Sequence, residues 1–128
     1  MELSEKYVKL VSEAKTKINE IDINFVQKLI NDKEIFLLID IREESEWENN
    51  RIPGAIYLGK GIIEREIESV APNNDTQIVL YCGGGYRSAL SAENLQRMGY
   101  KNVYSMIGGI TEWEEKDFPL NTEAPSKT

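Results

Sequence analysis

One stretch of the sequence decides the fold class of this chain: Gln77-Ile-Val-Leu-Tyr-Cys-Gly-Gly-Gly-Tyr-Arg-Ser88. It joins a short apolar run, typical of a buried strand, to three glycines, and it ends where a helical pattern begins. A glycine-rich turn between a strand and a helix indicates an α/β unit with the turn at the carboxyl end of the strand. Ligands of open α/β sheets bind at that edge, so the turn is the first candidate for a functional site.

The turn contains Cys82, the single cysteine of the chain. The glycines Gly83, Gly84 and Gly85 allow backbone amides to face inward and to form a concave site that prefers negative charge. The helix after the glycines adds unpaired N–H groups and the positive end of its dipole, which favour a thiolate over a thiol. Cys82 is therefore predicted to be reactive. The alternative is an inert cysteine packed in the core, where free cysteines are often found, but three consecutive glycines favour the reactive cysteine.

Arg87 comes after the glycines, and the sequence leaves two roles open for it. Its planar fork of donors can bind an anionic substrate, or it can hold loop carbonyls in place. The chain has no histidine, so no imidazole is available as a base for Cys82. Backbone dipoles and arginine would have to supply the activation instead.

Composition limits the classes of function. The 128 residues carry 15 basic and 22 acidic side chains, and the net charge of -7 argues against a nucleic acid or an anionic membrane as partner. One cysteine cannot form an internal disulfide, and without histidine neither a metal site nor a cofactor is expected. The amino terminus does not resemble a secretory signal and no apolar run is long enough to span a bilayer, so we expect a cytoplasmic protein.

Apolar periodicity divides the chain into alternating helices and strands. Residues 1–18 form a predicted amphipathic helix that is expected to pack on the domain rather than bind a partner. Asp22 is expected to cap a second helix, whose apolar side carries Phe25, Val26, Leu29 and Ile30. Strands are predicted at 35–41, 55–58, 78–82 and 103–106, and further helices at 43–49, 62–70 and 87–98, the last ended by Gly99.

This alternation predicts a three-layer α/β domain with a mostly parallel central sheet and an extra N-terminal helix. The chain divides into an N-terminal amphipathic helical extension (1–21), the α/β domain (22–118) and a polar tail that is expected to be disordered (119–128). With 128 residues, a single domain can bury a sufficient core without disulfides or structural metal ions.

Five segments of the chain match, in order, the motifs of one protein family. They are Asp40-Ile-Arg42 followed by Glu46-Trp47, then Arg51-Ile-Pro-Gly-Ala-Ile56, then Tyr81-Cys-Gly-Gly-Gly-Tyr-Arg-Ser88, then Leu95 with Gly99-Tyr-Lys-Asn-Val103, and finally Gly108-Gly-Ile-Thr-Glu-Trp113. Each segment alone is a common turn or helix start, but the ordered set is specific. Over residues 22–118 the chain resembles a single-domain rhodanese, a member of the rhodanese-like sulfurtransferase family.

The resemblance implies a persulfide mechanism. In rhodaneses the loop cysteine, here Cys82, takes a sulfane sulfur from a small anionic donor such as thiosulfate and passes it to cyanide, a thiol or a partner protein. The resemblance also implies that the outer sulfur is surrounded by the amides of five loop residues, with Ser88 starting the helix behind them. The five are Gly83, Gly84, Gly85, Tyr86 and Arg87.

Loop length separates this chemistry from that of related folds that hydrolyse phosphoesters or reduce arsenate. Those folds carry one more residue between cysteine and arginine, whereas only residues 83–86 separate Cys82 from Arg87. The shorter loop suits a single sulfur atom better than a tetrahedral oxyanion, which argues against a phosphatase.

The chain also departs from the family pattern. Where the family usually has a histidine before Ile52, this chain has Arg51, which either raises the positive potential near the site or is a solvated turn residue. Asp40 and Arg42 are expected to form a charge network that supports the loop rather than to contact substrate. Lys60 and Arg65 could attract an anionic donor, although basic residues that flank a helix are ordinarily solvated surface.

Two alternatives to a small-molecule sulfurtransferase stay open. The domain could carry sulfur between proteins, or it could be a regulatory binding module with little turnover. Some rhodanese-like domains of the second kind lack the cysteine, so the presence of Cys82 favours the enzyme. An acceptor would bind residues around the active site, and no sequence pattern identifies the acceptor from such residues. The physiological donor, the acceptor and the oligomeric state are therefore left open.

Overall fold

Five parallel strands form the central sheet of the protein. The computed structural model describes residues 3–123 and places the strands in the order β1-β5-β4-β2-β3. Their bounds are β1 (Asn19–Ile21), β2 (Leu37–Asp40), β3 (Ile56–Tyr57), β4 (Ile78–Tyr81) and β5 (Val103–Met106). Every ladder between these strands is parallel, which confirms the predicted α/β fold class.

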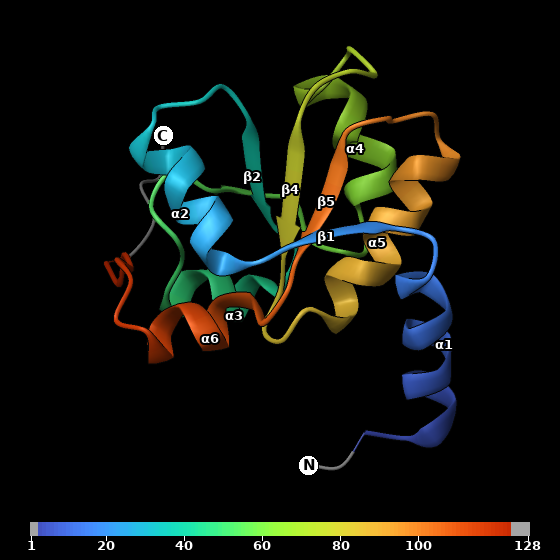
Figure 1. Ribbon diagram of the computed structural model, residues 1–128, viewed down its shortest axis with the longest axis horizontal. Coiled ribbons are helices and arrows are strands. Elements are labelled where there is room, and N and C mark those ends of the chain that lie inside the picture. The colour runs from blue at the N-terminus through green and yellow to red at the C-terminus, as the bar shows by residue number, and fades with distance from the viewer. Residues whose placement is uncertain (1–2, 124–128) are drawn as a thin grey trace.

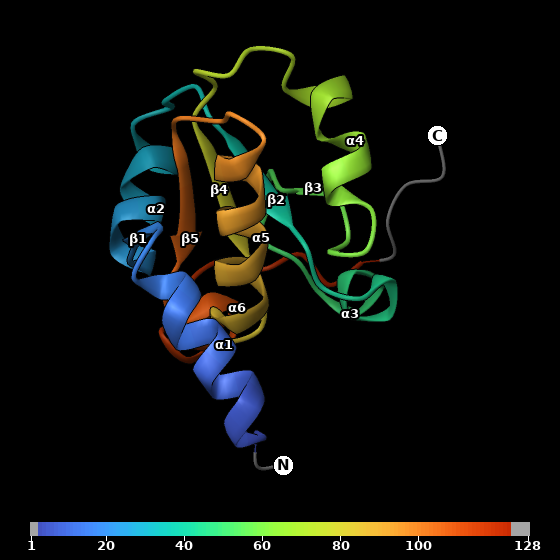
Figure 2. The same ribbon diagram turned by 90° about the vertical axis from the view of Figure 1, so that its right-hand side faces the viewer.

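Helices cover both faces of the sheet (Figures 1 and 2). Within residues 3–123 they are α1 (Glu5–Lys15), α2 (Ile23–Asn31), α3 (Glu44–Asn49), α4 (Ile63–Val70), α5 (Tyr86–Arg97) and α6 (Gly109–Glu115). Buried residues of α4 and α5 pack on one face, and those of α2 and α6 pack on the other. In that part of the chain, no helix combines the length and the apolar character needed to cross a membrane.

The two faces of β4 explain why its sequence is a continuous apolar run. Ile78 and Leu80 belong to the core beneath α4 and α5, whereas Val79 and Tyr81 belong to the core beneath α2 and α6. All four residues are fully buried. A strand covered on both faces needs apolar side chains at every position, which is the pattern expected of a parallel sheet.

The elements agree with the sequence predictions except in a few places. The Asp22 side chain caps α2 by accepting the Phe25 N–H at 2.8 Å, and Gly99 ends α5 with a φ of +107°, as predicted. The prediction that Phe25 lies on the apolar side of α2 is wrong, because its side chain is 49% exposed and Ile23 is buried instead. The edge strand β1 was not predicted, since Asn19-Glu-Ile21 contains no apolar run.

Both ends of the described chain contact the domain. The helix α1 packs on α5 through its buried residues Val11 and Ala14. Residues 119–123 fall in the predicted tail, yet Trp113 Nε1 donates to Pro119 O at 2.8 Å and Arg51 forms a bridge with Asn121. Residues 124–128 lie outside the described residues. The division at 21 and 118 stays a prediction.

Candidate active site

Cys82 lies directly after β4, in the middle of the carboxyl edge of the sheet. We call residues 82–88 the cradle. Gly85 has a φ of +92°, a left-handed conformation that glycine adopts without strain, and there the chain turns into α5. The helix begins at Tyr86, one residue earlier than predicted, so Ser88 is the third residue of α5 and not its first.

Two backbone amides point at the Cys82 sulfur. Gly85 N donates to Sγ at 3.2 Å and Ser88 N at 3.4 Å. The Ser88 N–H belongs to the first turn of α5, where amides have no partner within the helix. A side-chain oxygen usually caps that position, and here the sulfur of Cys82 occupies the place of the cap. Cys82 is only 1% exposed, so it is buried like a core residue. Unlike an ordinary core cysteine, its sulfur accepts two backbone hydrogen bonds.

Two serines continue the polar contacts below the sulfur. The Cys82 thiol lies 3.5 Å from Ser88 Oγ, and this hydroxyl lies 2.7 Å from Ser105 Oγ. Both serines are fully buried. Ser88 was a predicted site residue, whereas Ser105 was missed, because a single serine within β5 gives no signal in the sequence.

The start of α6 binds the carbonyl side of the cradle. Ile110 N donates to Cys82 O at 2.9 Å and Thr111 N donates to Gly83 O at 3.0 Å. The N–H and C=O groups of a planar peptide point in opposite directions, so holding the carbonyls toward α6 turns the amides away from it. Close approach requires Gly109, since a Cβ there would lie 2.3 Å from Gly83 O. The Gly108-Gly109 pair belongs to a quoted motif, but this contact was not predicted.

Arg87 is paired with Glu46 of α3. Its guanidinium donates to both carboxylate oxygens, at 2.8 and 3.2 Å, and lies over Gly83. The hydrogen bond from Arg87 lowers the pKa of Glu46 more than burial raises it, and the same bond raises the pKa of Arg87 against its burial. Of the two roles left open for Arg87, this pairing favours holding the loop. Glu46 was not among the predicted site residues, although it belongs to a quoted motif.

Asp40 and Arg42 form a buried ion pair after β2. Arg42 Nη2 lies 2.8 Å from Asp40 Oδ2 and also donates to Asn50 O at 2.6 Å. Burial disfavours the charge of Arg42, but the hydrogen bond and charge of Asp40 outweigh it and raise the pKa of Arg42. The guanidinium carbon lies 5.9 Å from the ring centre of Tyr81, the residue that precedes Cys82. The pair thus supports the ends of both β2 and β4.

Arg51 is buried, so of the two alternatives for this residue the solvated turn residue is wrong, and a raised positive potential near the site stays a prediction. It donates to Trp47 O at 3.2 Å and to Glu123 O, and its guanidinium lies 5.3 Å from the Trp47 ring centre. These contacts connect α3 to the C-terminal segment. Lys60 lines a hollow beside Arg42, whereas Arg65 is exposed and paired with its neighbour Glu66.

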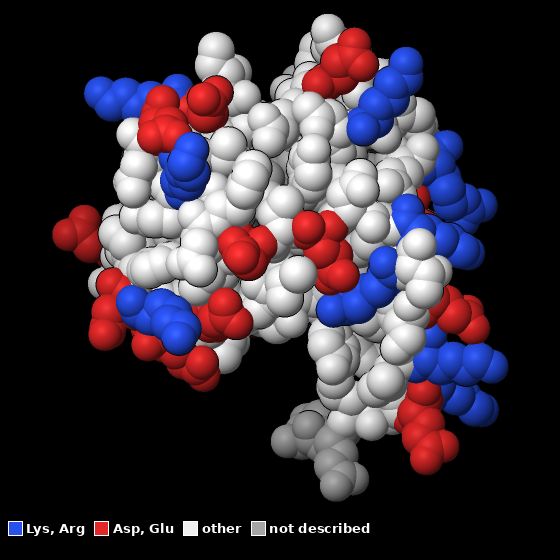
Figure 3. Space-filling model, viewed as in Figure 1, with Lys and Arg blue, Asp and Glu red and all other residues white. Residues whose placement is uncertain are grey.

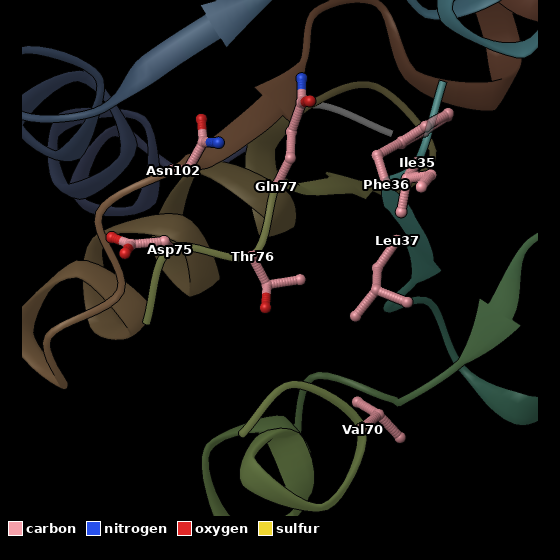
Figure 4. A pocket seen from close by; sticks show the side chains of 8 residues that line it. All are labelled: Ile35, Phe36, Leu37, Val70, Asp75, Thr76, Gln77 and Asn102. Atoms are coloured by element: carbon pink, nitrogen blue, oxygen red, sulfur yellow. The ribbon is translucent and has the colours of Figure 1, made fainter. Parts of the chain in front are cut away.

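A second hollow lies at the opposite edge of the sheet, near the amino ends of β2 and β4 (Figure 4). Its lining includes Leu37, Val70, Gln77 and Asn102, with Asp75 as its ionisable side chain. Its lining contains neither a cysteine nor a basic side chain, and it lies at the opposite edge of the sheet from Cys82. We therefore assign the candidate active site to the cradle and not to this hollow.

Comparisons with known proteins identify the family of the chain. The sequence model of one protein family, described as "Rhodanese-like domain", matches residues 22–116. A sulfurtransferase of Allochromatium vinosum is 32% identical over 103 residues, covering 80% of this chain and 94% of that protein. The Bacillus subtilis protein named "Putative sulfur carrier protein YrkF" is 28% identical over 105 residues, and this chain spans only 56% of its length. The chain belongs to the rhodanese-like family, which confirms the resemblance.

Solved structures show the same fold. A protein of unknown function from Rhodopseudomonas palustris, described as a possible tyrosine phosphatase, superposes with a TM-score of 0.84 at 27% identity. The match covers 94% of this chain and 98% of that one. It therefore includes at least part of α1, which precedes the residues matched by the family model.

Proposed function

We propose that the protein is a sulfurtransferase that moves a sulfane sulfur through a persulfide on Cys82. The convergence of the Gly85 and Ser88 amides on Sγ, at the start of α5, carries this proposal. Inward amides and a helix N-terminus stabilise an anion without a base, which suits a chain that has no histidine. The sulfurtransferase names of relatives support the same class of reaction.

In the first step, the Cys82 thiolate attacks the outer sulfur of a donor such as thiosulfate. A new S–S bond forms, the S–S bond of thiosulfate breaks, and sulfite leaves with the electron pair. The thiol proton has gone to solvent before the attack. The product is an anionic persulfide, and the inward amides of a glycine nest are the groups suited to hold its charge.

In the second step, a nucleophilic acceptor attacks the outer sulfur. The bond between that sulfur and Sγ breaks, and its electron pair returns to Cys82 as thiolate. Cyanide would leave as thiocyanate, and a thiol acceptor would leave as a persulfide. No oxidant, reductant or metal is required, because both steps exchange one sulfur–sulfur bond for a bond of the same sulfur to a nucleophile.

The cradle residues have separate roles in this proposal. Gly85 and Ser88 supply amides to the inner sulfur, and the amides of Gly83, Gly84, Tyr86 and Arg87 would face the outer one. Arg87 holds the cradle against α3 through Glu46. Asp40, Arg42 and Arg51 support the surrounding turns. A free thiol is kept reduced in the cytoplasm, which is the compartment that suits this chemistry.

Transfer to a protein acceptor is the second candidate, favoured by the name of the YrkF relative. It uses the same persulfide and differs only in the acceptor. A phosphatase is disfavoured by the short spacing from Cys82 to Arg87 and because the Arg87 guanidinium is already engaged by Glu46.

Intact-protein mass spectrometry tests the proposal. Reduced protein is incubated with thiosulfate and desalted, and we expect the mass to increase by one sulfur atom. Cyanide should remove that sulfur and release an equal amount of thiocyanate. Cys82→Ala serves as the control, and p-nitrophenyl phosphate hydrolysis serves as the phosphatase assay. Failure of every sulfane donor to load the protein, or thiocyanate formation by Cys82→Ala, would contradict the proposal.

A further inference from the structure

The helix α1 lies at the same edge of the sheet as Cys82. It crosses the start of α5 and projects beyond the carboxyl ends of the strands (Figures 1 and 2). Val11 and Ala14 anchor its second half against α5, and Ser4 Oγ caps its first turn by accepting the Tyr7 N–H at 3.3 Å. Figure 3 shows charged side chains on the outer side of the projecting helix and uncharged surface on the side turned toward the domain.

Two side chains of α1 hold Tyr86, the first residue of α5. The ring of Tyr7 lies 6.1 Å from the ring of Tyr86, tilted by 43°. The Lys15 ammonium lies 5.6 Å from the centre of the same ring. Tyr86 directly follows Gly85, so these contacts fix the first turn of the helix that carries the Ser88 amide. The amino-terminal helix is thus in contact with the cradle itself.

The charges of the site also act on Tyr7. Burial raises the pKa of Tyr7, and a negative charge on Cys82 raises it further, whereas Arg87 lowers it. The phenol therefore stays protonated at neutral pH and remains a hydrogen-bond donor. The ring contact with Tyr86, a cradle residue, places the Tyr7 side chain beside the cradle, and the direction of this pKa shift is consistent with that position.

The leaving group of an anionic donor needs a hydrogen-bond partner beside the cradle, in addition to the amides that face the sulfur. Arg87 is the nearest cation in the cradle, but both of its terminal nitrogens donate to Glu46. The chain has no histidine to take the role. A neutral phenol O–H that adjoins the cradle is a donor of the right kind, because hydrogen bonds to charged acceptors are stronger than those between neutral groups.

We propose that Tyr7 is a substrate-binding residue of the Cys82 site: its phenol O–H donates a hydrogen bond to the anionic end of the sulfane donor. For thiosulfate, the acceptor is an oxygen of the sulfonate group that leaves as sulfite. The inference rests on the proposed sulfurtransferase function and adds a residue to it. It also makes α1 part of the active site, although α1 precedes the residues that match the family model.

The test compares the second-order rate constant of sulfur loading from thiosulfate in wild type and in Tyr7→Phe. The phenylalanine keeps the ring against Tyr86 and removes only the hydroxyl. We expect the rate constant to fall at least about tenfold, which is the lower end of the range for one hydrogen bond to a charged group. Tyr104→Phe is the matched control, since this tyrosine packs on the opposite core with α2 and α6 and should load at the wild-type rate.

A binding measurement separates loss of the hydrogen bond from disturbance of the helix. In Cys82→Ser protein, which cannot accept the sulfur, thiosulfate affinity is measured by calorimetry with and without Tyr7→Phe. A weaker affinity at an unchanged melting temperature supports the proposal. Equal affinities and equal loading rates overturn it, and leave the sulfurtransferase function intact. If wild type itself takes no sulfur from any sulfane donor, the proposed function fails and this inference fails with it.

Discussion

The neighbouring strands β2 and β4 end at the carboxyl edge of the sheet, and different polar groups follow them: a buried ion pair after β2 and converging backbone amides after β4. Asp40 and Tyr81 face each other across β2 and β4, but the residues after them differ in kind. After Asp40, the buried charge of Arg42 is paired with a carboxylate and a carbonyl of the protein itself. After Tyr81, amide N–H groups converge on a single sulfur, with no cation bonded to it among the described residues.

This difference separates a structural cluster from the proposed active site. In the Arg42 cluster every charge is compensated within the protein. Removing one charged side chain therefore leaves its partner buried with an uncompensated charge. In the cradle the amide donors point at the sulfur, and in the proposed mechanism they would stabilise the negative charge of the thiolate and of the persulfide. The first cluster is therefore expected to matter for folding, and the second for chemistry. Four substitutions test this contrast.

Cys82→Ser should have the largest effect on activity and little effect on stability. Sulfur loading from thiosulfate is expected to be lost completely, because a hydroxyl is not a sulfur nucleophile. The hydroxyl oxygen can still accept the Gly85 and Ser88 amides, so the free energy of unfolding should change by less than about 1 kcal/mol. Mass spectrometry and urea denaturation measure the two quantities. A large loss of stability would show that the cradle, like the Arg42 cluster, is mainly structural.

Asp40→Ala should have the largest effect on stability. It leaves the guanidinium of Arg42 buried without its carboxylate, which we expect to cost about 4 kcal/mol of unfolding free energy. The matched control is Asp32→Ala, which removes an exposed partner of Lys28 and should cost less than about 0.5 kcal/mol. Similar midpoints in urea for the two variants would refute the assignment of Asp40 as a structural residue.

Gly109→Ala tests the contact between α6 and the cradle. The new Cβ would lie 2.3 Å from Gly83 O, and Gly109 has a φ of +59°, so we expect a loss of about 3 kcal/mol. Sulfur loading should fall as well, since the cradle carbonyls can no longer keep their positions. Gly61→Ala provides the comparison, because a Cβ there meets nothing within 4 Å. Equal stability of the two variants would mean that the cradle does not depend on α6.

Glu46→Gln should give the smallest effect. The folded protein holds the pKa of Glu46 below its usual value, mainly through Arg87, so the ionised pair stabilises the fold above the unfolded pKa of about 4.3. That contribution is lost as the pH falls through the folded pKa. Since both side chains are about one-third exposed, it should not exceed about 1 kcal/mol. Urea midpoints of wild type and Glu46→Gln at pH 7 and at pH 3 should differ more at pH 7.

Most of the fold could be predicted because the central strands are buried on both faces. The apolar runs before Asp40 and before Cys82, and the glycines that end or turn helices, each leave a local signal. The edge strand β1 leaves none, since it has three residues and no apolar run. Phe25 was assigned to the core from periodicity, which cannot show which helical face has room beneath it.

The candidate site was less predictable, because its polar contacts join distant parts of the chain. Cys82 and its loop are consecutive, so the sequence reveals them together. The pairing of Arg87 with Glu46, the hydroxyl contact of Ser88 with Ser105, and the burial of Arg51 beneath the C-terminal segment depend on tertiary structure. No spacing rule connects residues that lie so far apart in sequence.

The sulfur of Cys82 also anchors the first turn of α5, and this has a consequence for the durability of the protein. In the proposed transfer only the outer sulfur atom is gained and lost, while the inner sulfur stays bonded to its carbon and keeps its amide partners. Repeated turnover would therefore leave the scaffold undisturbed. Irreversible oxidation of the same atom to a sulfinic or sulfonic acid would add bulky oxygens inside a closed turn. Such damage would abolish the proposed sulfur transfer and at the same time destabilise the first turn of α5.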